Sequence, residues 1–436
     1  MKKQSLKLFL VLVLMLSTVL TACSGSESAS SETPKEAEGK VVVDFWTFWG
    51  SETRRPIIEK IIDDFNKSQE EIYVKHTYLP WGDIWTKELA AVAAGNPPDV
   101  VINDINTVKH RATKEQAENL SEYITDENFK DKFFPELWNT VLYEGDPYAV
   151  PFNTDTRVLF YNKDMFKEAG LDPNQPPETW EEVEQYAEKL TVKNGDRYER
   201  IGFYPLWNVG ADLWMLNADG EAYLNKDNEV VIDGKANVEA LKWINSFTEK
   251  YGRDTVNRFK AEFGNQQAHP FLAGKIAMFT DVATFYTQIR DYGGDMNVGV
   301  AKLPAREEGS GHTSWGGGFV AEVPKGSDTP EEAVEFIKYL TGKEAQKYWA
   351  VKNFDNVANI AGAEAAAKEL EGLDKKVYEL AVENMDNTVL TPIPLAAPEY
   401  LNTVNPIVEE VLLGTKSPEE ALAEAQKKVE ELVKQN

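Results

Sequence analysis

The stretch Val41-Val42-Val43-Asp44-Phe45-Trp46 decides the fold, because it is a short apolar run of the kind that forms a buried strand. Apolar residues from Ile57 to Phe65 then recur at helical spacing, directly after Pro56. The series continues with an alternating strand at 72–78, a helix at 84–94 and an apolar strand at 99–102. This βαβαβ order predicts an α/β fold built on a parallel sheet.

The residues that follow these three strands are aromatic or short and polar. In an open parallel sheet, ligands bind outside the carboxyl ends of the strands, so side chains at this edge are candidates for binding. Three strand ends therefore supply the first set of candidate ligand-binding residues, which are Trp46, Phe48, Trp49, Trp81, Asn103 and Asp104.

A second α/β region begins near Tyr148, with a strand predicted at 158–161 and a helix from Asp164 that closes at Gly170. Thr179 and Glu182 have the spacing of a capping box at the start of another helix. About 400 residues follow Lys40, which is more than one hydrophobic core normally serves. We therefore expect two lobes.

The N-terminal residues have the pattern of a secretion signal. Three lysines precede an apolar run from Leu8 to Leu20, which is shorter than the roughly 18 to 20 residues that span a bilayer. Leu20-Thr21-Ala22-Cys23 resembles a bacterial lipobox, so residues 1–22 are predicted to be a signal peptide and Cys23 the lipidated residue. An ordinary signal peptide with a chance cysteine is the alternative, but Cys23 is the only cysteine in the chain.

Two acyl chains on Cys23 would hold the mature protein on the extracellular face of the cell membrane. Residues 23–39 are polar and are predicted to be a flexible linker. The formal charge of -26 disfavours nucleic acid and anionic lipid as partners. Solubility explains this charge, and a cationic ligand is the alternative. The four histidines are scattered without metal-ligand spacing, so neither a metal site nor a cofactor is predicted.

Several segments together resemble the sugar-specific solute-binding proteins of ABC importers, the family that includes maltose-binding protein. The resemblance covers essentially the whole mature chain. The segments that carry it are Gly95-Asn96-Pro97-Pro98-Asp99-Val100-Val101, Tyr148-Ala149-Val150-Pro151, Leu159-Phe160-Tyr161-Asn162-Lys163-Asp164, Pro177-Glu178-Thr179-Trp180, Phe271-Leu272-Ala273-Gly274-Lys275-Ile276-Ala277-Met278 and Trp315-Gly316-Gly317-Gly318.

The resemblance implies a two-lobe periplasmic-binding-protein-like fold with hinge strands and an interlobe cleft. It implies that the chain crosses from one lobe to the other near Tyr148, Val298 and Thr341. The N-terminal lobe would comprise residues 40–147 and 299–342, and the C-terminal lobe residues 148–298 and 343–436. By the same resemblance we expect a protein that captures a carbohydrate and delivers it to an ABC importer permease, and we expect it to be a monomer. The aromatic side chains of Trp46, Trp49 and Trp81 favour an oligosaccharide over a monosaccharide.

A sugar offers apolar C–H faces and a ring of hydroxyls, so its site needs aromatic platforms together with carboxylates and amides. The second set of candidate ligand-binding residues is Asn153, Asp155, Trp207, Asp281, Trp315 and Gly316, where Gly316 would let the backbone approach the ligand. Core packing is the alternative for each tryptophan. We predict that the protein is not an enzyme. The competing functions are a secreted glycoside hydrolase, with a carboxylate pair in the cleft, and a peptide-binding protein of an ABC importer.

Overall fold

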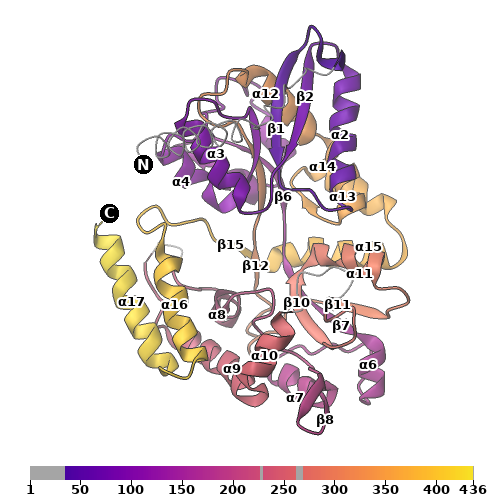
Figure 1. Cartoon of the computed structure of the whole chain (residues 1–436), viewed down its shortest axis with the longest axis vertical. Coiled ribbons are helices and arrows are strands. Elements are labelled where there is room, and N and C mark those ends of the chain that lie inside the picture. The colour runs from indigo at the N-terminus through magenta and orange to yellow at the C-terminus, as the bar shows by residue number, and fades with distance from the viewer. Residues whose placement is uncertain (1–34, 226–228, 262–268, 436) are drawn as a thin grey trace, which may run out of the picture.

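The chain folds into two lobes, each organised by its own β-sheet (Figure 1). The structure is a computed structural model that describes residues 35–225, 229–261 and 269–435. The predicted signal peptide, Cys23 and the linker up to residue 34 lie outside the described residues. The last residues of the predicted linker include the 3-10 helix η1 (Lys35–Ala37), in which Ala37 is buried.

The first lobe contains a six-stranded sheet in the order β14-β6-β13-β3-β1-β2. The strands are β1 (Val41–Thr47), β2 (Ile72–Tyr78), β3 (Val100–Asp104), β6 (Val150–Thr154), β13 (Gly318–Glu322) and β14 (Asn356–Val357). Strand β1 is parallel to β2 and β3, which confirms the sheet predicted from the opening βαβαβ series. Strand β13 is antiparallel to both β3 and β6.

Helices cover this sheet and bury the alternating apolar residues of its strands. They are α2 (Arg55–Ser68), α3 (Asp83–Ala93), α4 (Val108–Thr113), α5 (Pro135–Thr140), α12 (Pro330–Leu340), α13 (Lys343–Asn353) and α14 (Ile360–Glu369). Phe45 of β1, Phe65 of α2 and Phe336 of α12 pack edge to face, with Phe336 5.1 Å from Phe45 and 5.2 Å from Phe65 between ring centroids. The helix predicted after Pro56 is therefore α2, and its isoleucine face is buried.

The second lobe contains a three-stranded sheet with β7 (Arg157–Asn162) between β10 (Met278–Val282) and β11 (Val298–Ala301), antiparallel to both. Its helices are α6 (Lys163–Glu168), α7 (Trp180–Leu190), α8 (Ala211–Asp219), α9 (Lys235–Tyr251), α10 (Arg253–Lys260), α11 (Tyr286–Tyr292), α16 (Tyr400–Leu412) and α17 (Pro418–Gln435). Thr179 caps α7 by accepting the Glu182 N–H at 3.3 Å, as the capping-box spacing predicts. Helix α15 (Gly372–Asn384) contacts β14 of the first lobe and β11 of the second.

Short elements complete the two lobes. They are the hairpins β4 (Leu142–Tyr143) with β5 (Asp146–Pro147) and β8 (Val192–Asn194) with β9 (Arg197–Arg200), the parallel pair β12 (Ser314–Gly316) with β15 (Thr388–Leu390), and the 3-10 helices η2 (Ile105–Thr107), η3 (Phe129–Lys132), η4 (Ala283–Phe285) and η5 (Met385–Asn387).

The strand pairing corrects the predicted lobe boundaries. Strand β6 belongs to the first sheet, so the first crossing lies between Thr154 and Arg157 and not near Tyr148. Strand β11 belongs to the second sheet, so the next crossing falls between β12 and β13 and not near Val298. Helix α13 packs on α2 of the first lobe, so the return to the second lobe comes after Thr341. The first two predicted boundaries are wrong because strand pairing continues past the sequence motif, and the third because helix packing does.

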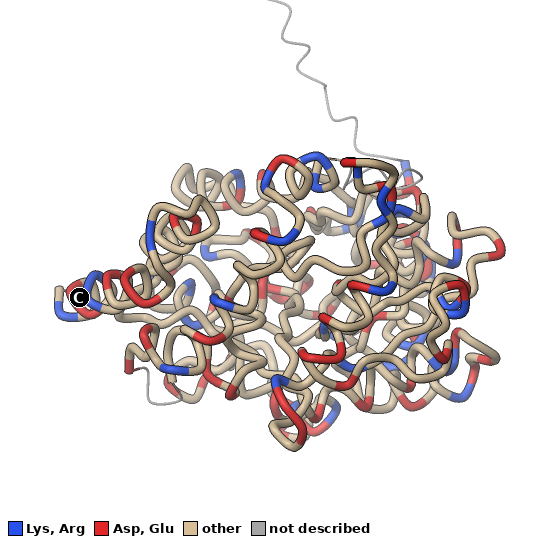
Figure 2. The backbone as a smooth tube through the Cα atoms, turned by 90° about the horizontal axis from the view of Figure 1, so that it is seen from below, with Lys and Arg blue, Asp and Glu red and all other residues tan. Residues whose placement is uncertain are grey.

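Acidic and basic residues are interspersed along the backbone throughout the molecule (Figure 2), and acidic residues are in excess. This distribution agrees with a role of the charge in solubility. Within the residues that the structure describes, no helix is both long and apolar enough to cross a membrane.

Candidate functional site

Four aromatic rings form a cluster at the carboxyl ends of β1 and β2, which we call the aromatic rim. Its members are Phe48, Trp81, Trp85 and Phe319. The Phe48 ring lies 4.7 Å from Trp81 and 4.8 Å from Phe319, and Trp81 lies 4.7 Å from Trp85. Trp81 is 60% exposed, so it offers a face to a ligand while the other rings hold it in place. The predicted meeting of aromatic side chains from successive strand ends is present for Phe48 and Trp81.

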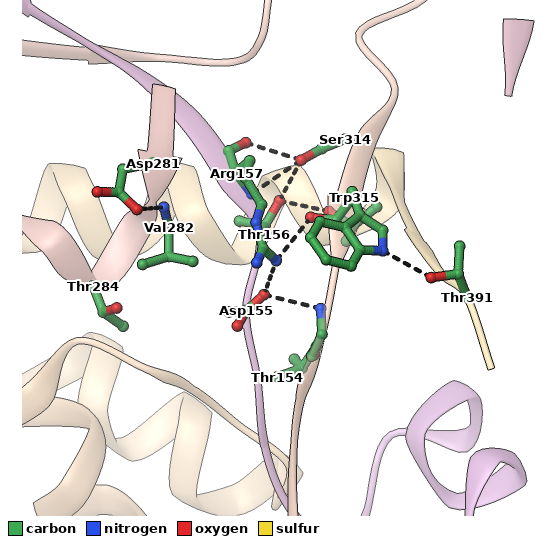
Figure 3. Close-up of polar contacts among 12 residues, drawn as sticks. Thr154, Asp155, Thr156, Arg157, Asp281, Val282, Thr284, Ser314, Trp315 and Thr391 are labelled. Carbon is green, nitrogen blue, oxygen red and sulfur yellow. Dashed lines mark hydrogen bonds and ion pairs between the residues drawn. The ribbon is translucent and has the colours of Figure 1, made fainter. Parts of the chain in front are cut away.

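The crossing segments place charged side chains beside Gly317, two residues before Phe319 of the aromatic rim. Arg157 forms an ion pair with Asp155, and its guanidinium lies 4.2 Å above the Trp315 ring centroid (Figure 3). Asp155 also accepts the Gly317 N–H at 2.9 Å. Because Phe319 follows Gly317 by only two residues, the backbone of β13 joins the charged group to the aromatic rim.

Three further carboxyl groups interact electrostatically with Arg157. Burial raises the pKa of Asp104 to about 6, and the Asp155 carboxylate adds to this rise while Arg157 opposes it. Burial likewise raises the pKa of Asp281 to about 6, with the same contributions from Asp155 and Arg157. Burial also raises the pKa of Asp212, and Arg157 opposes this rise. Arg157 therefore pairs with Asp155 and interacts electrostatically with three further carboxyl groups.

Hydrogen bonds orient two of these carboxyl groups. Asp281, at the end of β10, accepts the Asn208 side-chain N–H at 3.1 Å and the Val282 backbone N–H at 2.7 Å. Asp104, at the end of β3, accepts the Asn106 backbone N–H at 2.8 Å. Each carboxyl group keeps acceptor capacity beyond these bonds, because a carboxylate offers about four lone-pair sites.

Trp315 lies at the edge of a cavity of about 420 Å³ in the second lobe. The cavity lies between α8, α10 and α16, and its polar lining residues are Tyr204, Asp212, Thr248, Arg253, Asn257, Lys260, Asn405 and Glu409. The indole N–H of Trp315 donates to the Thr391 hydroxyl at 2.8 Å, and Arg157 covers one face of the ring. Trp315 is thus a fixed ring between the charged group and a polar cavity.

The structure corrects two predicted tryptophan platforms. Trp49 is 1% exposed and packs 4.4 Å from Trp349 and 5.1 Å from Phe152, so it is a core residue of the first lobe. Trp207 is also 1% exposed and stacks on Phe259. The large apolar area of Trp49 and Trp207 explains their positions, because the chain after a strand end can turn a ring into the core as readily as toward solvent. Trp46 lies half-buried within β1, where its indole N–H donates to Asp44 on the same face of the sheet, and its role in ligand binding stays a prediction.

Two predicted polar ligand residues have structural partners instead. Asn103 is 1% exposed and donates to Glu88 at 3.2 Å and to Glu322 at 3.1 Å. Asn153 is 2% exposed, donates to Asp355 at 2.9 Å and accepts the Phe319 N–H at 3.0 Å. Because both side chains are enclosed, these two predictions are wrong in this structure.

Gly316 is required by packing between strands. An added Cβ would lie 2.4 Å from Thr388 Cγ2 and 3.0 Å from the Asp155 carbonyl oxygen. The glycine therefore permits the close approach of β12 to β15 and to the crossing segment, which corrects the prediction that it approaches a ligand.

Several residues of the site lie outside the predicted set. Trp85 and Phe319 complete the aromatic rim, and Arg157, Asn208 and Asp212 complete the charged group. Trp85 follows Trp81 by one helical turn, which is a readable signal. Arg157 follows Asp155 by two residues at the start of a strand, and this spacing places both side chains on one face. Within the described ranges, no group of three or more histidine, cysteine, aspartate or glutamate residues has the arrangement to hold a metal ion.

The fold and this interlobe site define a solute-binding protein. Residues 49–347 match the family of bacterial extracellular solute-binding proteins, so the chain belongs to this family. This confirms the resemblance seen in the sequence, together with the two-lobe fold, its hinge strands and the cleft between the lobes.

Relatives of known ligand differ in what they bind. The solved structure of CpMnBP1 with mannotriose bound is 29% identical, with a TM-score of 0.78, and the match covers 89% of this chain and 100% of that one. The arabinooligosaccharide-binding protein of Bacillus subtilis is 24% identical, covering 81% of this chain and 80% of the relative. The sn-glycerol-3-phosphate-binding periplasmic protein UgpB of Pectobacterium atrosepticum is 26% identical, covering 89% and 90%. All three are binding proteins.

Proposed function

We propose that this protein captures a neutral oligosaccharide between its lobes and delivers it to an ABC importer permease. The observation that carries the proposal is the exposed Trp81 ring of the aromatic rim, and the carboxyl groups that interact electrostatically with Arg157 support it. An aromatic face suits the C–H face of a sugar ring, and carboxylates accept its hydroxyl protons. The ligands of the mannotriose- and arabinooligosaccharide-binding relatives agree with this chemistry.

The charge of the site disfavours a phosphate ester as the ligand. A phosphomonoester carries about -1.5 to -2 charges at neutral pH and is bound through cationic side chains. Here the guanidinium of Arg157 is already paired with Asp155 and also interacts electrostatically with Asp104 and Asp281. We therefore propose a neutral sugar over sn-glycerol 3-phosphate, although one relative binds the latter.

Isothermal titration calorimetry tests the ligand class. Mannotriose and an arabinooligosaccharide are titrated into the protein, with sn-glycerol 3-phosphate and a tripeptide as the competing classes. We expect heat of binding for at least one neutral oligosaccharide. Binding of the phosphate ester or the peptide alone would contradict the proposal. Chromatography of the same mixtures after long incubation tests the hydrolase alternative, for which released products would be decisive.

A single substitution tests the aromatic rim. Trp81→Ala is expected to weaken oligosaccharide affinity by about tenfold or more, because it removes an exposed ring that would stack on a sugar. Its effect on folding stability is expected to be small. Leu373→Ala, which alters a side chain of 44% exposure on α15, is the control and is expected to leave affinity unchanged. Equal affinities of all three proteins would exclude Trp81 as a platform.

We further propose that the mature protein is tethered through Cys23 to the extracellular face of the membrane. The support is the lipobox-like segment that ends at the chain's only cysteine. Metabolic labelling with an alkyne analogue of palmitate is expected to mark the wild-type protein in the membrane fraction. Cys23→Ser is expected to lose the label, and retention of label in that variant would refute the anchor.

A further inference from the structure

Residues 388–399 form a connection between the lobes that is separate from the backbone crossings at β6–β7 and β12–β13, and we call this segment the strap. It begins as β15, paired in parallel with β12, and ends at the first turn of α16. In Figure 1 it runs between the two lobes on the side where α4 and α16 lie. The strap lies beside the proposed binding site because Thr391 contacts Trp315.

One end of the strap is tied to the second lobe at the crossing. The Thr388 and Thr156 hydroxyls are 2.6 Å apart, and the Thr388 hydroxyl donates to the Asn384 carbonyl at 2.7 Å. Three residues later, Thr391 accepts the Trp315 indole N–H at 2.8 Å (Figure 3). The position of the strap is therefore coupled to the ring that Arg157 covers.

The middle of the strap bonds to the first lobe. The Ile393 N–H donates to the Asn106 carbonyl oxygen at 2.9 Å. Asn106 lies in η2, whose first turn is capped by Asp104. Hydrogen bonds at Thr391 and Ile393, joined by the backbone of the strap, thus connect Trp315 to the carboxyl end of β3.

The sequence of the strap makes this contact specific. Ile393 stands between Pro392 and Pro394, which have no N–H and have fixed φ angles. Ile393 is consequently the residue that supplies an N–H between Thr391 and Leu395. The segment also loses little conformational entropy on folding, because the two prolines restrict the unfolded chain as well.

A cavity of about 640 Å³ lies against the strap and is shared by both lobes. Strap residues 389–396 and the end of α8 line it from the second lobe, and Lys109 of α4 lines it from the first. The strap is therefore not packed solidly on this side. It has space into which it can move when the lobes change their separation.

We propose that the strap is an interlobe latch. Through the Ile393–Asn106 hydrogen bond it restrains separation of the lobes when no ligand is bound, and through Thr391 its position is coupled to that of the Trp315 ring. This inference does not depend on which solute the protein binds. A movable hydrogen-bonded connection of this kind would set the fraction of ligand-free molecules whose lobes are separated and have to close when a ligand binds.

Distance measurements between spin labels test the latch in the full chain without ligand. Cys23→Ser removes the only native cysteine, and labels are placed at Leu89→Cys on α3 and Leu413→Cys after α16, which are 40% and 43% exposed. Ile393→Pro removes the N–H donor. It is expected to shift the ratio of separated to close-lying lobes by roughly threefold to tenfold toward separation. Ile393→Val keeps the N–H and is expected to match the parent.

A second variant covers the case in which Ile393→Pro does not fold, as judged by circular dichroism. Thr391→Val removes the acceptor of the Trp315 N–H without changing the strap backbone, and it is also expected to lengthen the label distances. If Ile393→Pro folds, longer label distances in it with Ile393→Val unchanged support the latch, and parent-like distances overturn it. If Ile393→Pro does not fold, Thr391→Val decides in the same way.

Discussion

Individual side chains at the interlobe site divide into those that face solvent and those that the lobes enclose. Trp49 and Trp81 both follow strand ends in the sequence, yet Trp49 is 1% exposed and Trp81 is 60% exposed. The same residue type thus has two roles that depend on which way the chain turns after the strand. The difference leads to opposite expectations for substitution.

Trp49→Ala is expected to destabilise the protein by about 3–5 kcal/mol, because it leaves a cavity among Phe152 and Trp349. Denaturant unfolding followed by circular dichroism measures this loss. The oligosaccharide affinity of the remaining folded protein is expected to change little. A large affinity loss with unchanged stability would mean that Trp49 reaches the ligand after all.

Proton release on binding tests the role of Asp281. Its pKa of about 6 means that roughly half of this carboxyl group is protonated at pH 6 in the free protein. A sugar hydroxyl that donates to the carboxylate favours the ionised form, so binding is expected to release up to about 0.5 proton from Asp281 and to strengthen as pH rises through 6. Calorimetry at pH 6 in buffers of different ionisation enthalpy measures the release. Asp281→Asn is expected to reduce it, and an unchanged release would assign the proton to another group.

The elements of the first lobe enclose an ionic cluster that links α3, α4 and β13. Arg111 of α4 bonds to Glu322 at 2.8 Å and also pairs with Glu88 of α3, while Asn103 donates to both carboxyl groups. Burial raises the pKa of Glu88 to about 8; Arg111 opposes this rise and Glu322 adds to it. The two carboxyl groups compete for one guanidinium, so the cluster favours a bound proton at neutral pH.

Glu88 is therefore expected to make stability depend on pH. Its pKa is raised in the folded state, so its stabilising contribution is complete below the ordinary value of 4.5 and is lost as pH rises through about 8. Glu88→Gln is expected to flatten the fall in unfolding free energy between these values. Glu344→Gln, at a side chain that is 79% exposed, is the control. Identical pH profiles for Glu88→Gln and the wild type would contradict the assignment.

Adjacent glycines at the start of β13 differ in what they tolerate. At Gly318 the φ angle is +144° and an added Cβ would lie 2.3 Å from the Asn153 carbonyl oxygen, whereas at Gly317 the closest atom would be 3.6 Å away. Gly318→Ala is expected to lower the unfolding free energy by about 1–3 kcal/mol or more, and Gly317→Ala by much less. Thermal denaturation of both variants compares them directly, and equal losses would show that the crossing adapts to an added methyl group.

The whole molecule consists of two lobes whose relative position is controlled by two backbone crossings, helix α15 and the strap. Ligand binding between the lobes is expected to reduce the radius of gyration in small-angle X-ray scattering. At a concentration about 100 times the Kd of whichever oligosaccharide binds, the unfolding free energy is expected to rise by about 2.7 kcal/mol. Stabilisation without any decrease in radius would indicate binding to lobes that are already closed or that do not move.

Local sequence patterns by themselves determined the opening elements of the first lobe, a few elements of the second and one edge of the site. Periodicity predicted β1, α2, β2, α3 and β3, because a period of 2 or 3.6 residues depends only on which side of an element is buried. The order of these elements fixed the parallel pairing and hence the gathering of Phe48 and Trp81 at one sheet edge. Matching family motifs added the second lobe.

Only the tertiary structure decided the lobe boundaries and the roles of the individual site residues. Strand β6 joins the first sheet through hydrogen bonds to β13, about 170 residues later, and no local pattern records such a partner. Burial of Trp49 and Asn103 and the gathering of Arg157 with Asp104 and Asp281 likewise depend on segments distant in the chain. The physical reason is that side-chain solvation and charge pairing are properties of the assembled surroundings, whereas periodicity is a property of the local chain.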